Sequence, residues 1–192
     1  MEKKIILAST SPYRKKLLER LGISFEARNP GVDEGPLKES LKDPRKLSEE
    51  LAKLKAKSAF RSLDEITIGS DQVLDLEGRL LGKPGSKEKA IEQLLEMQGK
   101  EHTLITAVCI FEEGKEDLFT SIAKMKMRRL DKDAITRYVD YDNPIDCAGS
   151  YKLESLGISL FESVSVDDST GIIGLPLIQL AKILRQKGLS IP

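Results

Sequence analysis

The spacing of apolar residues along the chain alternates between two patterns. Short apolar runs typical of buried strands recur at 5–7, 23–28, 66–69, 73–76, 80–81, 102–112, 117–129 and 158–161. Between them, apolar residues three and four apart predict helices over 12–21, 44–60, 86–97 and 176–187, and a further helix that opens at Asp131. Residues 29–43 are polar and rich in proline, glycine and acid, so we expect a loop there. This alternation predicts an α/β fold in which helices cover a mixed or parallel sheet.

One predicted helix, 44–60, carries a lysine where an apolar residue is expected. At 100° per residue its two apolar stripes lie side by side and consist of Leu47, Leu51, Leu54 and Ser58, and of Ala52, Ala56 and Ala59. Lys55 falls between these stripes, whereas Lys53 and Lys57 lie on the opposite side of the helix. Either the Lys55 side chain extends to the edge of the helix so that its ammonium reaches water, or it has an anionic partner.

The segment between the first strand and the first helix has the residue types of an anion site. Ser9, Thr10 and Ser11 precede Pro12, a residue favoured at the first helical position. The free N–H groups of a helix start attract anions, the hydroxyls of Ser9 and Ser11 add donors, and Arg14 adds a planar fork that matches phosphate oxygens. The alternative is an ordinary serine cap followed by a surface arginine.

Three further positions are candidates for chemistry. Asp71 follows the short strand 66–69, and ligands of α/β sheets gather where strands end, although an aspartate there also commonly forms a turn. Lys83 lies in a Gly/Pro bend that is otherwise typical of an exposed turn. Asp33-Glu34 is suited either to a cation or to water. The candidates form a mainly cationic set, and a metal–polyphosphate substrate requires such a set. Its members are Arg14, Lys55, Lys83, Glu34 and Asp71.

The composition of the chain limits the classes of partner that the protein is expected to bind. Thirty-one basic and thirty-one acidic residues cancel, and only nine of the 192 residues are aromatic, so a nucleic-acid polymer is not the expected partner. The N-terminal apolar stretch is too short for a signal peptide and no run approaches a membrane span, which predicts a cytoplasmic protein without membrane contact. Two cysteines and one histidine form neither a disulfide framework nor a zinc site, and Cys109 is expected in the core. With no repeat, low-complexity tract or linker, residues 1–192 are predicted to form one domain with room for two lobes.

Taken in order, several motifs resemble the Maf family of nucleoside triphosphate pyrophosphatases over nearly the whole chain. The segments that carry the resemblance are LASTSPYRKKLL (7–18), VDE (32–34), LAKLKA (51–56), GSDQV (69–73), LGKP (81–84), residues 99–108, CAGSYKLESLG (147–157) and IGLPL (173–177). The resemblance implies an elongated mixed central sheet flanked by helices, with two lobes around a cleft, as in inosine triphosphatase-like folds. It also implies hydrolysis of a nucleoside triphosphate to the monophosphate and pyrophosphate with Mg²⁺ or Mn²⁺, and a homodimer.

The same resemblance assigns roles to the candidate residues. Asp71 matches the proposed general base, and Arg14, Lys55 and Lys83 match phosphate-binding positions, next to the Ser9–Ser11 loop. Glu34 matches a metal or water ligand, with Asp71 as a second metal ligand. If Glu34 lies close to Asp71, like-charge repulsion is expected to raise the pKa of one of the two.

Three positions resemble the subgroup of 7-methyl-GTP pyrophosphatases. Tyr13 stands where many Maf proteins have the first arginine of SPRR, Gln72 follows Asp71, and Glu154 replaces a glutamine. Tyr13 is suited to stack on the cationic 7-methylguanine base, Glu154 to accept from its N–H groups, and Gln72 to add an amide contact. The alternatives are a packing role for Tyr13 and a surface position for Glu154. Competing functions are a Maf pyrophosphatase for dTTP, UTP or CTP, and a nucleotide-sensing regulator of cell division.

Overall fold

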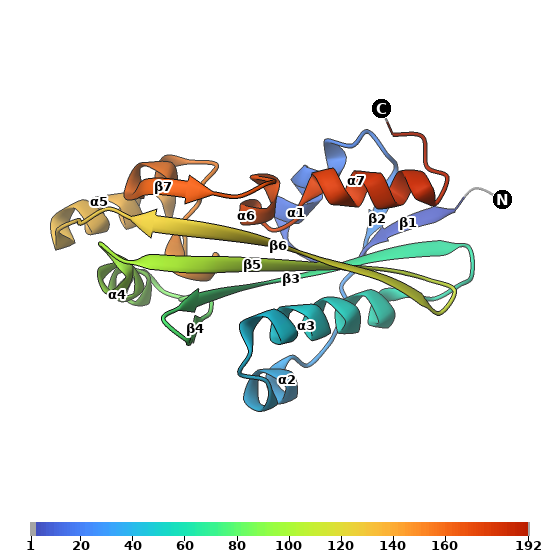
Figure 1. The fold of residues 1–192 in the computed structure, drawn as a ribbon, viewed down its shortest axis with the longest axis horizontal. Helices are drawn as coiled ribbons and strands as arrows, with labels where there is room; N and C mark the ends of the chain where they lie inside the picture. Colours follow the sequence, from blue (N-terminus) through green and yellow to red (C-terminus); the bar gives the residue numbers. More distant parts are fainter. Residues whose placement is uncertain (1–2, 192) are drawn as a thin grey trace. The chain divides into compact units, whose positions relative to one another are not determined.

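A computed structural model describes residues 3–191 and contains a mixed seven-stranded sheet (Figure 1). Its strand order is β2-β1-β3-β5-β6-β7, with β4 paired to β3. The strands are β1 (Lys4–Leu7), β2 (Phe25–Ala27), β3 (Glu65–Leu76), β4 (Arg79–Leu81), β5 (Glu101–Glu112), β6 (Lys115–Met127) and β7 (Phe161–Ser165). The α-helices are α1 (Pro12–Glu19), α2 (Gly35–Ser40), α3 (Pro44–Ala59), α4 (Lys87–Met97), α5 (Lys132–Asp142), α6 (Thr170–Ile173) and α7 (Leu177–Gln186), and two 3₁₀ turns are η1 (Ala148–Ser150) and η2 (Leu156–Leu160). The prediction of an α/β fold with a mixed sheet flanked by helices is confirmed.

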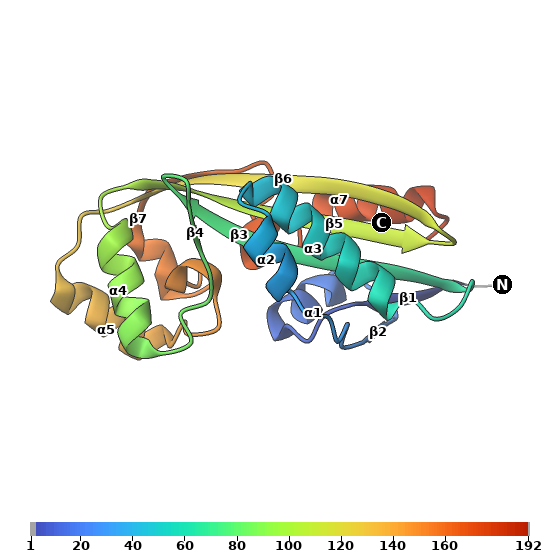
Figure 2. The same cartoon turned by 90° about the horizontal axis from the view of Figure 1, so that it is seen from below.

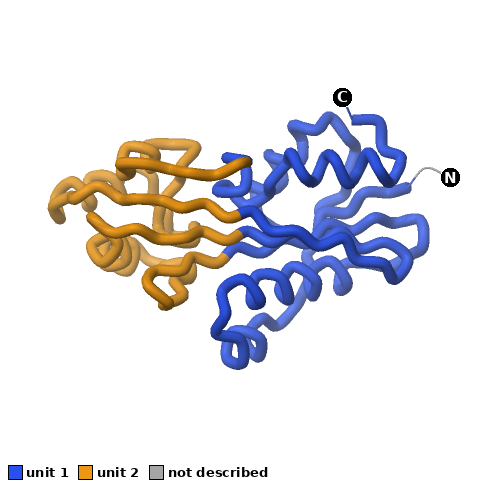
Figure 3. Tube along the Cα trace, in the orientation of Figure 1, with its two compact units in different colours: residues 1–72, 106–121, 168–192 blue, residues 73–105, 122–167 orange. Residues whose placement is uncertain are grey.

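The chain divides into two compact units, coloured separately in Figure 3. The first contains residues 1–72, 106–121 and 168–192, and the second contains residues 73–105 and 122–167. Strands β3, β5 and β6 each contribute residues to both. This division leaves open whether residues 1–192 act as the single domain predicted, and that point stays a prediction.

In the first unit, helices cover both faces of the sheet because successive strand residues point to opposite sides. On one face, Ile5 and Leu7 of β1 and Ile66 and Ile68 of β3 pack with apolar residues of α1 and α7. On the other face, alanines of α3 pack against Ala107 and Cys109 of β5. Figure 2 shows α3 running along the strands on this second face. Cys109 is a core residue, as predicted.

Parallel pairing places β1 between β2 and β3, with Ile5 opposite Phe25 on one side and Ile66 on the other. Two hairpins, β3–β4 and β5–β6, complete the sheet. Glu77-Gly78 and Glu113-Gly114 all have positive φ, from 49° to 86°, which suits the tight twist of a two-residue hairpin.

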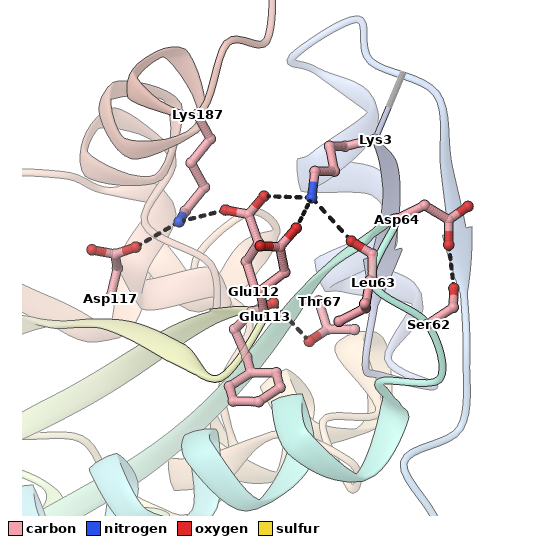
Figure 4. A network of polar contacts seen from close by, with 10 residues as sticks. Lys3, Ser62, Leu63, Asp64, Thr67, Glu112, Glu113, Asp117 and Lys187 are labelled. Carbon is pink, nitrogen blue, oxygen red and sulfur yellow. Dashed lines mark hydrogen bonds and ion pairs between the residues drawn. The ribbon is translucent and has the colours of Figure 1, made fainter. Parts of the chain in front are cut away.

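Charged residues tie the ends of the first unit together, as Figure 4 shows. Lys3 Nζ lies 2.6 Å from a carboxylate oxygen of Glu113 and 3.2 Å from one of Glu112. Lys187, at the C-terminal end of α7, lies 3.0 Å from Glu112 and 2.8 Å from Asp117. A cation at a helix C-terminus is also favoured by the helix dipole. The first strand, the β5–β6 turn and the last helix are thereby connected.

The five predicted helices are present, but three other predictions are wrong. The 29–43 loop contains α2, which has no buried residue and therefore no apolar pattern to reveal it. The strand predicted to stop at 69 continues as β3 to Leu76, so Asp71 lies within a strand and does not follow one. Residues 158–160 belong to η2, and β7 begins only at Phe161.

Candidate active site

The core of the candidate site is an ion pair between α3 and β3. Lys55 Nζ lies 2.6 Å from Asp71 Oδ1 and 2.7 Å from Glu34 Oε1. The Lys55 and Asp71 residues are 8% and 7% exposed. Of the two alternatives for Lys55, the anionic partner is confirmed, and extension to the helix edge is excluded. A buried charge requires such a partner because removing it from water is costly.

Gly69 allows this pair to form. A Cβ atom at position 69 would lie 2.2 Å from the carbonyl oxygen of Ala52 and 2.5 Å from the amide nitrogen of Ala56. Both atoms belong to the backbone of α3, so only glycine lets the helix approach β3 this closely. Asp71 is two residues further along the same strand and therefore points to the same side, toward Lys55.

Glu34 lies at the outer side of this pair, where it precedes α2. Its second carboxylate oxygen lies 2.5 Å from Lys38 Nζ, and its side chain is 28% exposed. One carboxylate therefore joins a buried lysine and a surface lysine. Lys38 was not among the predicted site residues, although its i,i+4 spacing from Glu34 is a recognisable signal in the sequence.

The two acids of the site have opposite pKa shifts. Burial raises the pKa of Asp71, against the charges of Lys55 and Arg14, and the charge of Glu34 adds a smaller contribution in the raising direction. Burial also opposes ionisation of Glu34, but hydrogen bonds from Lys38 and Lys55 outweigh it and lower its pKa to about 2. The expected rise in one pKa is present, but burial is its main cause and the charge of Glu34 is a minor one.

Arg14 approaches the same acids from α1, and its charge acts on both Asp71 and Glu34. Its Nε donates to the carbonyl of Gly174 at 2.9 Å, and the Ser70 hydroxyl donates to the same oxygen at 2.9 Å. Partial burial lowers the pKa of Arg14, and Asp71 and Glu34 counter it. The structure thus brings together four of the predicted residues: Arg14, Glu34, Lys55 and Asp71.

The serine loop forms the start of α1. Ser11 is the N-cap residue, and its Oγ accepts from the amide of Arg14 at 3.4 Å. The Ser9 Oγ accepts in turn from the amide of Ser11 at 3.2 Å. The ordinary capping role named as an alternative is therefore present at Ser11, and each hydroxyl retains its O–H as a donor.

Gln72 lies on the other face of β3, next to Asp71 in sequence. Its NH₂ group contacts Thr106 Oγ1 at 2.9 Å and the carbonyls of Gly171 and Ile172 at 3.0 and 2.9 Å. The predicted contact of Gln72 with a base would therefore have to use its carbonyl oxygen. Tyr13 is half-buried in the first turn of α1.

A family model described as Maf-like protein matches residues 4–187. The chain belongs to the Maf family. It is 50% identical over 188 residues to a protein of Bdellovibrio bacteriovorus named 7-methyl-GTP pyrophosphatase, covering 98% of this chain and 99% of the relative. Relatives with the same name in Aromatoleum aromaticum and Pseudomonas aeruginosa are 45% and 40% identical, each covering 98% of both chains. The family resemblance seen in the motifs is confirmed.

Two predicted residues of this Maf protein belong to the second unit. Lys83 lies between β4 and α4, and Glu154 lies in the turn between η1 and η2. Both side chains are exposed. The surface position considered for Glu154 is thus confirmed, while the roles of Lys83 and Glu154 in binding stay predictions.

The acidic residues fit a metal ion that arrives with a substrate. Among residues 3–191, no group of three or more His, Cys, Asp or Glu side chains is arranged to hold a metal. Asp71 and Glu34 supply two carboxylates that share one lysine contact. Mg²⁺ is typically held by one or two carboxylates, with phosphates and waters completing its coordination.

Across residues 3–191, no helix is long and apolar enough to cross a membrane.

Proposed function

We propose that the protein is a nucleoside triphosphate pyrophosphatase that acts on 7-methyl-GTP and releases 7-methyl-GMP and pyrophosphate. One observation carries the proposal: a buried aspartate, Asp71, is paired with a buried lysine, Lys55, next to Arg14 at the start of a helix. Three relatives that match almost end to end carry the name of this activity. Cytoplasmic location and a homodimer stay predictions.

In this proposal Asp71 is the general base. Its carboxylate takes a proton from the water that attacks the α-phosphorus, and the α–β anhydride bond breaks as pyrophosphate leaves. Burial raises the pKa of Asp71, so the carboxylate is a stronger base than an exposed aspartate. The ammonium of Lys55, 2.6 Å away, favours the ionised form of this carboxylate, and Lys55 is itself held in place by Glu34.

Arg14 and the start of α1 bind the triphosphate. Phosphoryl transfer depends on positioning and charge neutralisation more than on covalent chemistry by the protein. Because Gly174 accepts from Nε of Arg14, the two terminal NH₂ groups form the fork that faces a phosphate. Ser9 and Ser11 add hydroxyl donors and Lys83 adds a further cation. Asp71 and Glu34 would hold a divalent ion, Mg²⁺ or Mn²⁺, which neutralises phosphate charge when bound.

Base selection is assigned to Tyr13 and Glu154, with Gln72 in a supporting role. The 7-methylguanine ring is cationic, so stacking on an aromatic ring and hydrogen bonding to a carboxylate both favour it over a neutral pyrimidine. The NH₂ group of Gln72 is occupied by Thr106 and the α6 segment. Gln72 therefore contributes mainly by fixing its surroundings.

Pyrophosphate release from a panel of canonical and methylated triphosphates, with Mg²⁺ and with Mn²⁺, tests this function. The proposal predicts the highest kcat/KM for 7-methyl-GTP, and the combined variant Tyr13→Arg with Glu154→Gln is expected to shift the preference toward UTP. The highest kcat/KM for UTP, dTTP or CTP would favour the pyrimidine-specific alternative. Binding of triphosphates without turnover would favour the nucleotide-sensing alternative.

A further inference from the structure

The orientation of Arg14 is determined by a backbone carbonyl of a segment that lies 160 residues away in sequence. Arg14 Nε donates to the carbonyl of Gly174, which also accepts from Ser70. Helix α6 contacts α1, and Gly174 follows α6 directly. The direction of the guanidinium fork therefore depends on where this carbonyl points.

Position 174 requires glycine for this purpose. Its φ of 121° lies in a region that other residues rarely adopt. A Cβ atom there would also lie 3.3 Å from Arg14 Nε and 3.7 Å from Arg14 Cγ. The backbone at this point is thus shaped for close contact with Arg14.

A single buried carboxylate holds the segment in this shape. Asp168 Oδ1 accepts from the amide and the hydroxyl of Thr170, at 2.9 and 2.5 Å, and Asp168 Oδ2 accepts from the amide of Ile178 at 2.7 Å. The Thr170 hydroxyl also accepts from the amide of Leu177 at 2.8 Å. Asp168 and Thr170 are both buried. The two oxygens of Asp168 therefore bracket the whole stretch from 170 to 178, with Gly174 in its middle.

The hydrogen bond from the Ile178 amide to Asp168 replaces the usual local cap of α7. The N-cap residue is Pro176, which makes no side-chain hydrogen bond to the helix. A helix start is normally capped by a Ser, Thr, Asp or Asn directly before it, whereas here the carboxylate comes from ten residues upstream. A cap from that distance also closes the intervening loop.

We propose that Asp168 is a positioning residue for the reaction: by closing the 170–178 loop it aims the Gly174 carbonyl at Arg14 and so orients the guanidinium for the triphosphate. This inference rests on the proposed role of Arg14 in binding phosphate. The competing explanation is that Asp168 only caps α7 and stabilises the fold.

A double-mutant cycle between Asp168 and Arg14 separates the two explanations. Asp168→Asn removes one acceptor oxygen and is expected to lower kcat/KM for 7-methyl-GTP about 10-fold or more, because small misplacements of a substrate-binding group are costly. Arg14→Lys keeps the charge but lacks the Nε that binds Gly174. In this background, Asp168→Asn is expected to change kcat/KM by about 2-fold or less, because the two residues act through one contact.

A second readout does not depend on turnover. The hydrogen on Arg14 Nε, followed through its ¹⁵N–¹H NMR signal, is expected to exchange slowly with solvent in the wild type. In Asp168→Asn this hydrogen is expected to exchange faster. If the wild type hydrolyses no triphosphate, the proposed function fails, while this signal still tests the positioning role.

Two further variants complete the design. Thr170→Val keeps the shape of the side chain and the two backbone contacts of Asp168 but removes the acceptor of the Leu177 amide. It is expected to show a smaller effect on kcat/KM that again disappears in Arg14→Lys. Asp131→Asn is the matched control, because Asp131 caps α5 through the Ala134 amide at 2.7 Å in the second unit; its kcat/KM is expected to stay within about 2-fold of the wild type. The proposal would be overturned if Asp168→Asn lowered kcat/KM by the same factor in the wild type and in Arg14→Lys. It would also be overturned if Asp168→Asn left the exchange of the Arg14 Nε hydrogen unchanged.

Discussion

Asp71 and Glu65 are carboxylates of the same strand, β3, and their exposed fractions are nearly equal, 7% and 5%. Each pairs with a buried cation, yet their pKa values shift in opposite directions. Hydrogen bonds from Arg28 lower the pKa of Glu65, whereas burial raises the pKa of Asp71. Similar solvent exposure of two carboxylates therefore does not fix the direction of their pKa shifts.

Asp71 lies deeper below the protein surface than Glu65, and the two acids also differ in how completely each is hydrogen-bonded. Glu65 receives two bonds from the guanidinium of Arg28, at 2.9 and 3.1 Å, and a third from the amide of Arg61 at 2.8 Å. Arg28 is bound in addition by the carbonyl of Ala59 and by Glu26. Among residues 3–191, Asp71 accepts one side-chain hydrogen bond, from Lys55 to Oδ1. The first arrangement is typical of structural ion pairs, and the second leaves capacity for a reactant.

The largest expected effect comes from the incompletely bonded acid. Asp71→Asn preserves the shape of the side chain but removes the base, so kcat is expected to fall about 1,000-fold or more. A loss of about 1,000-fold is within the usual contribution of general base catalysis, and the charge that pairs with Lys55 and the other cations is lost as well. The fold is expected to remain intact, because burial disfavours the ionised form that the substitution removes and Lys55 keeps Glu34 as its anionic partner. Pyrophosphate release and thermal unfolding measured on the same preparation check both statements. An inactive but unfolded variant would contradict the comparison.

The matched change in the fully bonded acid is expected to act on stability instead. Glu65→Gln leaves the buried Arg28 guanidinium with only the exposed Glu26 as an ionic partner and is expected to lower the free energy of unfolding by about 3 kcal/mol. Glu26→Gln is the control, because Glu26 binds the same guanidinium but its side chain is 59% exposed; about 1 kcal/mol or less is expected. Denaturant titration gives the free energies, and kcat/KM is expected to stay unchanged in both folded variants.

The two acids are also expected to respond to pH in opposite ways. The pKa of Glu65 is lowered by folding, so its stabilisation is present above its ordinary value of 4.5 and is lost as the pH falls through the folded pKa. The pKa of Asp71 is raised, so its contribution is present below its ordinary value of 3.8 and is lost as the pH rises through the folded pKa. The stability difference between wild type and Glu65→Gln is therefore expected to shrink toward acid pH. Wild type is expected to lose stability relative to Asp71→Asn as the pH rises from about 4 toward neutrality. Parallel trends for the two acids would contradict the assignment.

The smallest effect is expected at the outer lysine. Lys38 binds Glu34 at the surface, and its side chain is 56% exposed. Lys38→Met removes one of the two hydrogen bonds that lower the pKa of Glu34, while Lys55 remains. A change in kcat/KM of about 3-fold or less is expected, since exposed ion pairs contribute little. A loss as large as that of Asp71→Asn would assign Lys38 to the reaction itself.

The sequence predicts the parts of this site that depend on local pattern. The place of Lys55 between two apolar stripes follows from helical spacing, and the cap Ser11 follows from residue type and position. The extent of β3 does not follow, because Ser70, Asp71 and Gln72 look like the end of a strand until their partners from α3 and α6 are known. Helix α2 has no apolar face to detect.

Contacts between distant segments account for the rest. The hydrogen bond from Arg14 to Gly174 spans 160 residues, and no periodicity links the two positions. The need for glycine at positions 69 and 174 comes from atoms that would contact a Cβ there, and these atoms belong to segments distant in sequence. The Arg28–Glu65 pair is likewise invisible in one sequence, because neither residue interrupts a pattern.

Hydrolysis in H₂¹⁸O tests most directly whether water attacks the α-phosphorus, the step in which Asp71 is proposed to act as the base. The wild type is incubated with 7-methyl-GTP and Mg²⁺ or Mn²⁺, and both products are analysed by mass spectrometry. We predict one ¹⁸O atom in 7-methyl-GMP and none in pyrophosphate. Label in pyrophosphate, or release of inorganic phosphate with 7-methyl-GDP, would contradict the account.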